Sequence, residues 1–122
     1  MQPWERRMLR AIYGGVNTEN GWQRKTNEKI ETTYKERKIT TFIKAQRIRW
    51  LGDIERMEKN RMTKMVLNRK PTGKKRKGKP HKRWMDGVKD DLQMLNSITE
   101  WKDKTTERRK WKRIAKEASE KL

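Results

Sequence analysis

An all-α fold is predicted for this 122-residue chain, namely a small irregular bundle of about five helices interrupted by a disordered basic arm. Two observations predict it. Apolar residues recur at helical spacing on both sides of a stretch rich in Pro, Gly and Lys. In addition, six Trp and seven Met carry much of the apolar surface, and each Trp can bury about 200 Å² and so seed a core. The expected segments are 1–68, helical; 69–83, the arm; and 84–122, a helical pair.

The N-terminal segment is expected to hold helices at 3–13, 27–37 and 40–58, a loop at 14–26, and a last helical turn or two from Thr63. Pro3 suits a first helical position and Gly14 a stop, while Asn27 can cap the second helix. The expected apolar stripe of the first helix comprises Trp4, Met8, Ala11 and Ile12, and Ile30 and Tyr34 form the edge of the second.

The helix at 40–58 is capped in this interpretation by Thr40 or Thr41. Its apolar stripe is Phe42, Ile43, Trp50, Leu51, Ile54 and Met57. Gly52 lies within that stripe and is costly in a helix, so it is expected to mark a close contact with another helix.

The C-terminal pair begins at Trp84. Apolar residues then step by four, four and three positions through Val88, Leu92 and Leu95, which is typical of an amphipathic helix. Asn96-Ser97 is expected to break this helix, and Thr99 to cap a last helix that ends near Ala118, with Trp101, Trp111 and Ile114 as its apolar contacts.

Charge is the strongest functional signal. The net charge is +19, from 35 Lys and Arg against 16 Asp and Glu, so a body of this size must carry a strong positive field, for which phosphate is the usual partner. The absence of cysteine suits the cytosol or nucleus. The start of the chain lacks a secretory signal, and no apolar run approaches the length of a membrane span.

The arm, RKPTGKKRKGKPHKR at 69–83, holds nine Lys and Arg and no acidic residue, and its two Pro and two Gly disfavour a helix. Flexible cations can displace counterions from a polyanion without fixed geometry. A solvated spacer is the alternative, but the charge exceeds what solubility requires. The KKRK run also fits a nuclear import signal, so a nuclear location with a cytoplasmic pool is expected. The predicted nucleic-acid-binding residues are Arg69, Lys70, Lys74, Lys75, Arg76, Lys77, Lys79, Lys82 and Arg83, supported by Arg49, Lys110 and Arg113.

Trp50, Trp84 and Trp111 each lie beside a cation and could stack on bases, but their place on apolar stripes favours core packing. Trp22, in the expected loop, is the better stacking candidate, although packing is equally compatible with its position.

No catalytic or metal-binding pattern is expected in the chain. Asp90-Asp91 sits on a helix beside Lys89, without the third carboxylate of a polymerase site, and is expected to form a solvated or salt-bridged face. His81 has no ligand partners at metal spacing. The prediction is a non-enzyme without cofactor, metal or small-molecule substrate.

The order of motifs resembles a known family. RRMLRAIYGGV, ENGWQRKTNEKI, IKAQRIRWLGDIERMEKNR, GKKRKGKPHKRWMDGVKDDL and WKDKTTERRKW together look like the C-terminal tail of LINE-type (non-LTR, RTE-like) retrotransposon endonuclease–reverse transcriptase polyproteins, over nearly the whole chain. Asp53 departs from the family's usual His, and Lys104 and Thr105 from its Leu and Ala. The resemblance implies that the parent's catalytic residues lie upstream of Met1, and that the tail holds RNA or DNA near the polymerase domain, itself a possible partner.

Two other interpretations stay open. The chain could be a retrotransposon relic without a selected role, or a host basic protein that binds chromatin or RNA. Among the interpretations of function, an enzyme is the least favoured. Binding to a membrane surface is also disfavoured, because the arm has no apolar face to insert.

Overall fold

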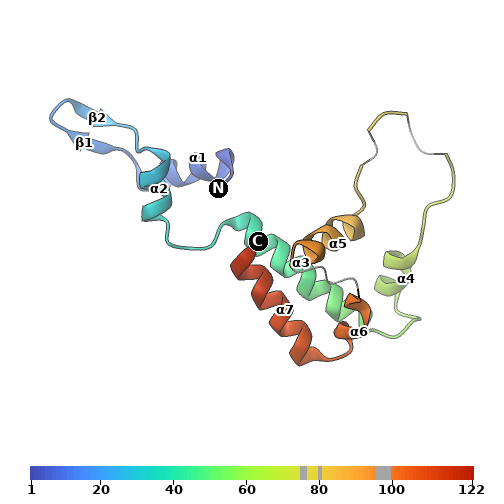
Figure 1. Ribbon diagram of the computed structural model, residues 1–122. Coiled ribbons are helices and arrows are strands. Elements are labelled where there is room, and N and C mark those ends of the chain that lie inside the picture. Colours follow the sequence, from blue (N-terminus) through green and yellow to red (C-terminus); the bar gives the residue numbers. More distant parts are fainter. Residues whose placement is uncertain (75–76, 80, 96–99) are drawn as a thin grey trace. The chain divides into compact units, whose positions relative to one another are not determined.

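The computed structural model describes residues 1–74, 77–79, 81–95 and 100–122, and the chain divides into two compact units, Met1–Thr40 and Thr41–Leu122. The described residues form seven helices and one two-stranded hairpin, so the mainly helical prediction is confirmed and the exclusion of a sheet is wrong. In chain order the elements are α1 (Pro3–Tyr13), β1 (Val16–Thr18), β2 (Gly21–Gln23), α2 (Asn27–Thr33), α3 (Ile39–Glu55), α4 (Met62–Asn68), α5 (Trp84–Met94), α6 (Trp101–Thr105) and α7 (Arg108–Lys121) (Figure 1).

The first unit is held together where α1 contacts α2. Leu9 and Ile30 are its buried apolar side chains among the described residues. The face of α1 that turns inward carries Leu9 and Glu5, and one carboxylate oxygen of Glu5 accepts a hydrogen bond from the backbone N–H of Ile39 at 2.9 Å. This bond satisfies one of the unpaired N–H groups at the start of α3. The expected apolar stripe of α1 is therefore wrong, because Trp4, Met8, Ala11 and Ile12 are exposed.

The expected loop at 14–26 contains the hairpin. Strands β1 and β2 pair antiparallel, with Val16 opposite Gln23 and Thr18 opposite Gly21. Gly21 has a φ of +96°, a backbone conformation that glycine adopts without strain. The Asn20-Gly21 pair is a known hairpin signal, and the sequence interpretation overlooked it.

The second helix is shorter than expected and differently capped. The side chain of Thr26, not that of Asn27, accepts from the backbone N–H of Lys29 at 3.3 Å. The helix ends at Thr33 rather than Arg37, and Glu31 forms an ion pair with Arg6 at 3.4 Å.

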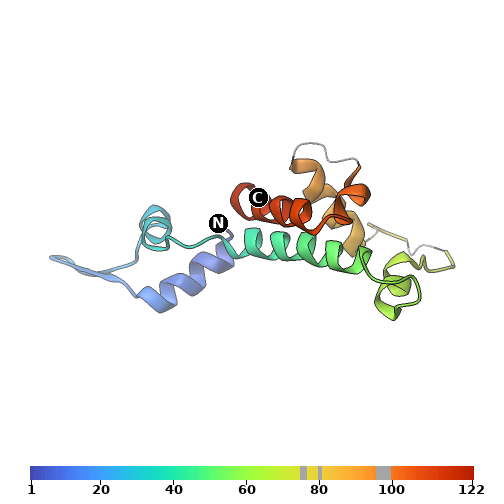
Figure 2. The same cartoon turned by 90° about the horizontal axis from the view of Figure 1, so that it is seen from below.

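The second unit contains the main hydrophobic core, which is built by α3, α5, α6 and α7, and α3 and α7 lie side by side in both views (Figure 1, Figure 2). The core residues are Ala45, Ile48, Leu51, Val88, Leu92, Leu95, Trp101, Trp111, Ile114 and Ala118. The apolar stripe predicted for α5 is confirmed at Val88, Leu92 and Leu95 but is wrong at Trp84, which is exposed. The apolar contacts predicted for the last helix are confirmed.

Trp111 is the centre of the contact between α3 and α7. Its indole N–H donates to the backbone carbonyl of Ile48 at 2.8 Å. A Cβ atom at Gly52 would lie 2.1 Å from the indole ring, so only glycine leaves room for this approach. The expectation that Gly52 marks a close helix contact is confirmed.

Helix α3 begins at Ile39, so neither Thr40 nor Thr41 caps it as expected, and three further expectations about α3 and α4 are wrong. Helix α3 ends at Glu55 and buries Ala45, Ile48 and Leu51, while much of its expected stripe (Phe42, Ile43, Trp50 and Met57) is exposed. Helix α4 begins at Met62 and not after a Thr63 cap.

The last helix, predicted to be continuous, is split into α6 and α7. The hydroxyl of Thr105 donates to the carbonyl of Lys102 at 2.6 Å, that of Thr106 donates to the carbonyl of Asp103 at 2.7 Å, and Arg56 donates to the carbonyl of Thr105 at 2.9 Å. Threonine side chains that bond to the backbone in this way compete with helix continuation. The expected break at Asn96-Ser97 and the Thr99 cap lie outside the described residues.

Candidate nucleic-acid interface

The basic arm joins α4 to α5, and its described residues form no helix or strand and are all exposed (Figure 1). Gly73 and Gly78 have φ values of +120° and +109°, which suit glycine. Lys75 and Arg76 lie outside the described residues. The sequence therefore predicted correctly that the Pro and Gly residues would exclude a helix from the described part of the arm.

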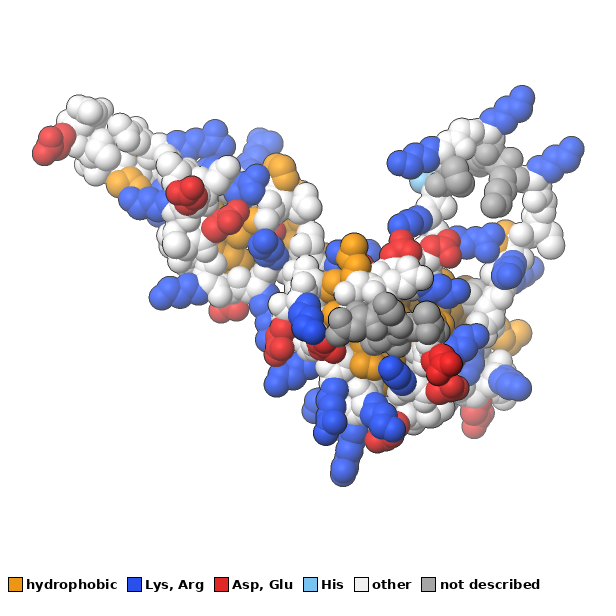
Figure 3. Space-filling view, in the orientation of Figure 1, with side chains coloured by type: hydrophobic (Ala, Val, Ile, Leu, Met, Phe, Trp, Pro, Cys, Tyr) orange, Lys and Arg blue, Asp and Glu red, His pale blue; other side chains and the backbone are white. Residues whose placement is uncertain are grey.

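Most of the arm's cations face solvent. In the described part of the arm, the only ion pair links Lys82 to Asp90 of α5. The hydrogen bond that the Lys82 ammonium donates to Asp90 raises the pKa of Lys82, and the negative charge of Asp90 adds to the effect. Lys and Arg side chains project outward from the arm (Figure 3). The described cations without such a partner are Arg69, Lys70, Lys74, Lys77, Lys79 and Arg83.

The predicted supporting cations lie on two helices. Arg49 is exposed on α3, and Arg113 is exposed on α7. Lys110, also on α7, is engaged with Glu107 at 2.7 Å. An exposed Lys–Glu pair of this kind contributes little to stability and can exchange for a phosphate contact.

A groove with a volume of about 1190 Å³ opens where α3, α4, α5 and α6 meet both ends of the arm. The Lys64 ammonium holds α4 against the end of α3 by donating to the carbonyls of Glu55 at 2.7 Å and Met57 at 3.2 Å. Leu67 packs against the core from the same helix. The groove is therefore formed by elements that are anchored to the core of the second unit.

Three tryptophans line this groove, and two of them, Trp50 and Trp84, contradict the expectation of core packing. Trp50 is 55% exposed and Trp84 is 37% exposed, whereas Trp111 is buried as expected. Trp22, the favoured stacking candidate from sequence, is 77% exposed on β2 of the first unit and does not line the groove.

The lining of the groove carries five cations and three carboxylates. The cations are Arg69, Lys70, Arg83, Lys89 and Lys102, and the carboxylates are Asp53, Glu55 and Asp86. Among the carboxylates that line it, Asp53 pairs with Arg56 at 2.6 Å, and Asp86 accepts from the backbone N–H of Arg83 at 3.3 Å. Cations outnumber carboxylates in the lining by five to three, so the groove favours an anionic partner.

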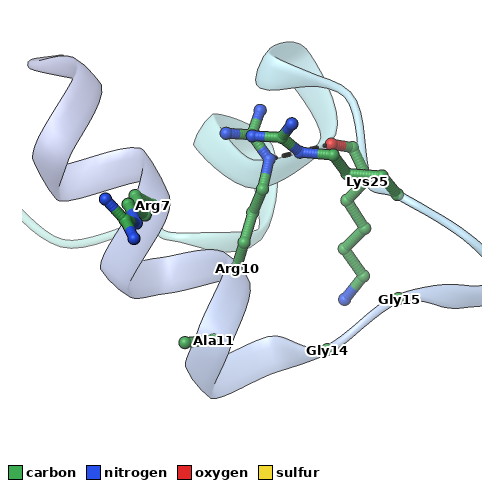
Figure 4. A pocket seen from close by; sticks show the side chains of 7 residues that line it. Arg7, Arg10, Ala11, Gly14, Gly15 and Lys25 are labelled. Atoms are coloured by element: carbon green, nitrogen blue, oxygen red, sulfur yellow. Dashed lines mark hydrogen bonds between the residues drawn. The ribbon is translucent and has the colours of Figure 1, made fainter.

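A second group of cations, missed by the sequence interpretation, surrounds a pocket of about 270 Å³ in the first unit (Figure 4). Arg10 donates to the carbonyl of Lys25 at 3.1 Å and also bonds to Asn27. Loss of water around its guanidinium lowers the pKa of Arg10, and repulsion from Arg24 and Arg6 lowers it further. The hairpin brings the two basic runs RRMLR and RK together, so linear spacing could not have shown the group.

Other polar groups have structural roles. Asp90 pairs with Lys82, and the largely buried Asp91 pairs with Lys44 at 3.6 Å, so the expected salt-bridged face is confirmed. His81 is exposed. In the part of the chain that the structure describes, no cluster of three His, Cys, Asp or Glu is placed to hold a metal ion. No described helix is long and apolar enough to cross a membrane.

The sequence matches no protein-family model, no curated protein and no solved structure to a significant degree. The resemblance to the retrotransposon tail therefore rests on the motifs within the chain.

Proposed function

We propose that this chain is a non-catalytic nucleic-acid-binding segment, of the kind found in the tail of LINE-type reverse transcriptases, that grips the phosphate backbone of RNA or DNA with little sequence preference. Its place of action is the nucleus, where the polymerase domain of a parent polyprotein is a possible neighbour.

The observation that supports the proposal most strongly is the state of the arm. Its described cations are exposed, and all but Lys82 lack a carboxylate partner there, so their charge is available to an external polyanion. Cations that are already solvated and unpaired lose little when they meet phosphate, and the release of condensed counterions supplies the driving force.

Little sequence preference follows from the same geometry. Reading a base edge requires an Arg or Asn side chain held in a bidentate position by a rigid element in the groove of the duplex. The described part of the arm contains neither helix nor strand, so it lacks such an element. Phosphate contacts then position the ligand without specifying its sequence.

The proposal is tested by measuring, with fluorescence anisotropy across a salt series, how tightly the chain binds two unrelated duplexes and one RNA hairpin. If about six phosphates are neutralised, the slope of log affinity against log salt on duplex DNA should be near −5. The affinity should then fall roughly a thousandfold between 50 and 200 mM salt. Absence of binding at 50 mM salt, or a preference for one duplex by about a hundredfold or more at equal salt, contradicts the proposal.

A further inference from the structure

We propose that the groove beside the arm binds single-stranded nucleic acid by stacking unpaired bases on Trp50 and Trp84. This inference rests on the proposed function and specifies which form of nucleic acid the second unit prefers.

The two tryptophans are exposed, and the helix backbones that carry them are held by the core. Trp50 neighbours Leu51, which is fully buried in the core, and Trp84 opens α5, which is anchored by Val88 and Leu92. Each ring is therefore carried by a helix with a packed opposite face. A base that stacks on such a ring does not have to order the backbone as well.

The chemistry of the groove matches bases joined by phosphates. Five cations line it against three carboxylates, of which Asp53 and Asp86 are engaged by other groups. Two of its aromatic residues, Trp50 and Trp84, are exposed. Aromatic platforms with surrounding cations are the usual means of binding single strands without sequence preference. In a duplex the bases are already stacked on one another, so they cannot reach the two rings without unpairing.

The arm and the groove are continuous. Both ends of the arm line the groove, through Arg69 and Lys70 at its N-terminal end and Arg83 at its C-terminal end. A strand whose phosphates contact the arm would therefore have its neighbouring nucleotides at the groove. The arm supplies charge, and the groove supplies contacts that depend on the bases.

The experiment compares an oligo-dT of about twelve nucleotides, within the site sizes of single-strand binders, with an abasic phosphodiester of equal length. Affinities are measured by anisotropy at one fixed salt concentration for the wild type, Trp50→Ala, Trp84→Ala and the double Ala variant. Trp4→Ala is the matched control, because it removes an exposed Trp that does not line the groove and has no predicted role in stacking. The double variant Trp50→Phe with Trp84→Phe keeps a stacking surface at both positions.

The wild type should bind oligo-dT at least tenfold more tightly than the abasic chain. Each groove Ala substitution should weaken oligo-dT binding about tenfold and leave abasic binding unchanged, since stacking does not involve the phosphates. Trp4→Ala should have no effect, and the Phe pair should keep most of the affinity.

Equal wild-type affinity for the two ligands overturns the groove proposal alone, since phosphate binding by the arm would remain. Binding to neither ligand overturns the proposed function as well. Unchanged oligo-dT binding in the Ala variants, together with a loss of self-association in sedimentation, identifies the groove as a contact between copies and also overturns the proposal. If an Ala variant loses its helical circular dichroism, the test rests on the wild type and the Phe pair. Equal affinity of these two proteins for oligo-dT and the abasic chain then overturns the groove proposal.

Discussion

At the scale of single residues, the contact between Trp111 and Gly52 explains how a chain with few aliphatic side chains holds a core. The indole ring of Trp111 lies against the backbone of α3 at Gly52. Its N–H donates a hydrogen bond to the carbonyl of Ile48, which is four residues before Gly52 in the same helix. The burial of a polar N–H costs free energy unless it finds a partner, and this bond supplies one.

Gly52→Ala is expected to destabilise the second unit. Alanine favours a helix by about 1 kcal/mol over glycine, but here its Cβ atom would overlap the indole ring of Trp111, and overpacking costs about 1–3 kcal/mol or more. Urea unfolding followed by circular dichroism should show a lower midpoint. Gly87→Ala is the matched control, because a Cβ atom at this position in α5 would meet nothing within 4 Å. This substitution should raise the free energy of unfolding by up to about 1 kcal/mol. Equal shifts in the two variants would refute the packing explanation.

Trp111→Ala and Trp84→Ala should differ in their effect on the free energy of unfolding. Trp111 is 2% exposed and Trp84 is 37% exposed. Truncation of the buried ring should cost about 3–5 kcal/mol, and truncation of the accessible ring about 1–2 kcal/mol. A Trp84→Ala variant as unstable as Trp111→Ala would show that the Trp84 ring is part of the core, and it would weaken the case for a stacking groove.

At the scale of elements, periodicity predicted α5 well and α3 poorly, for a physical reason. Most apolar residues of α5 lie on one face, with the exposed Met94 outside it, so the buried stripe through Val88, Leu92 and Leu95 could be predicted. Helix α3 carries apolar residues on more than one face, and only the tertiary contact with α5 and α7 selects the face that is buried. The same ambiguity assigned Trp50 to the core, although it lines the groove.

The candidate site was predictable only in part. The arm's composition identified its cations directly, because charge density is visible in a linear sequence. The groove and the cations around Arg10 are formed by residues distant in sequence, such as Trp50 with Lys102 and Arg10 with Lys25, so their proximity depends on tertiary structure. The short hairpin had a local signal at Asn20-Gly21, and it could have been predicted from sequence.

At the scale of the whole molecule, burial is uneven between the two units. In the described residues, the first unit buries Leu9 and Ile30, whereas the second buries the ten-residue core cluster. Local opening requires less free energy where few apolar contacts are broken. Amides of α1 and α2 should therefore exchange with deuterium faster than those of α3, α5 and α7. Equal protection in both units would contradict this ranking.

The purified chain should show neither template-dependent primer extension nor nicking of DNA in Mg²⁺ or Mn²⁺. Such chemistry requires carboxylates that hold two metal ions, whereas Asp90 and Asp91 are paired with Lys82 and Lys44. Incorporation of nucleotides by the chain alone, above the level of a mock purification, would overturn the non-catalytic assignment.

The central claim is that the arm binds phosphate, and a salt titration of an arm variant tests it most directly. The variant replaces Lys74, Lys75, Arg76 and Lys77 by Ala. Its matched control replaces four exposed cations elsewhere, Lys29, Lys35, Arg37 and Lys59, so that both variants lose the same charge. The account predicts that the arm variant flattens the log–log salt slope on duplex DNA by about 3 to 4 units, equally on unrelated sequences, while the control changes it by less than about one unit. An arm variant that keeps the wild-type slope would contradict the account and leave the arm as a spacer.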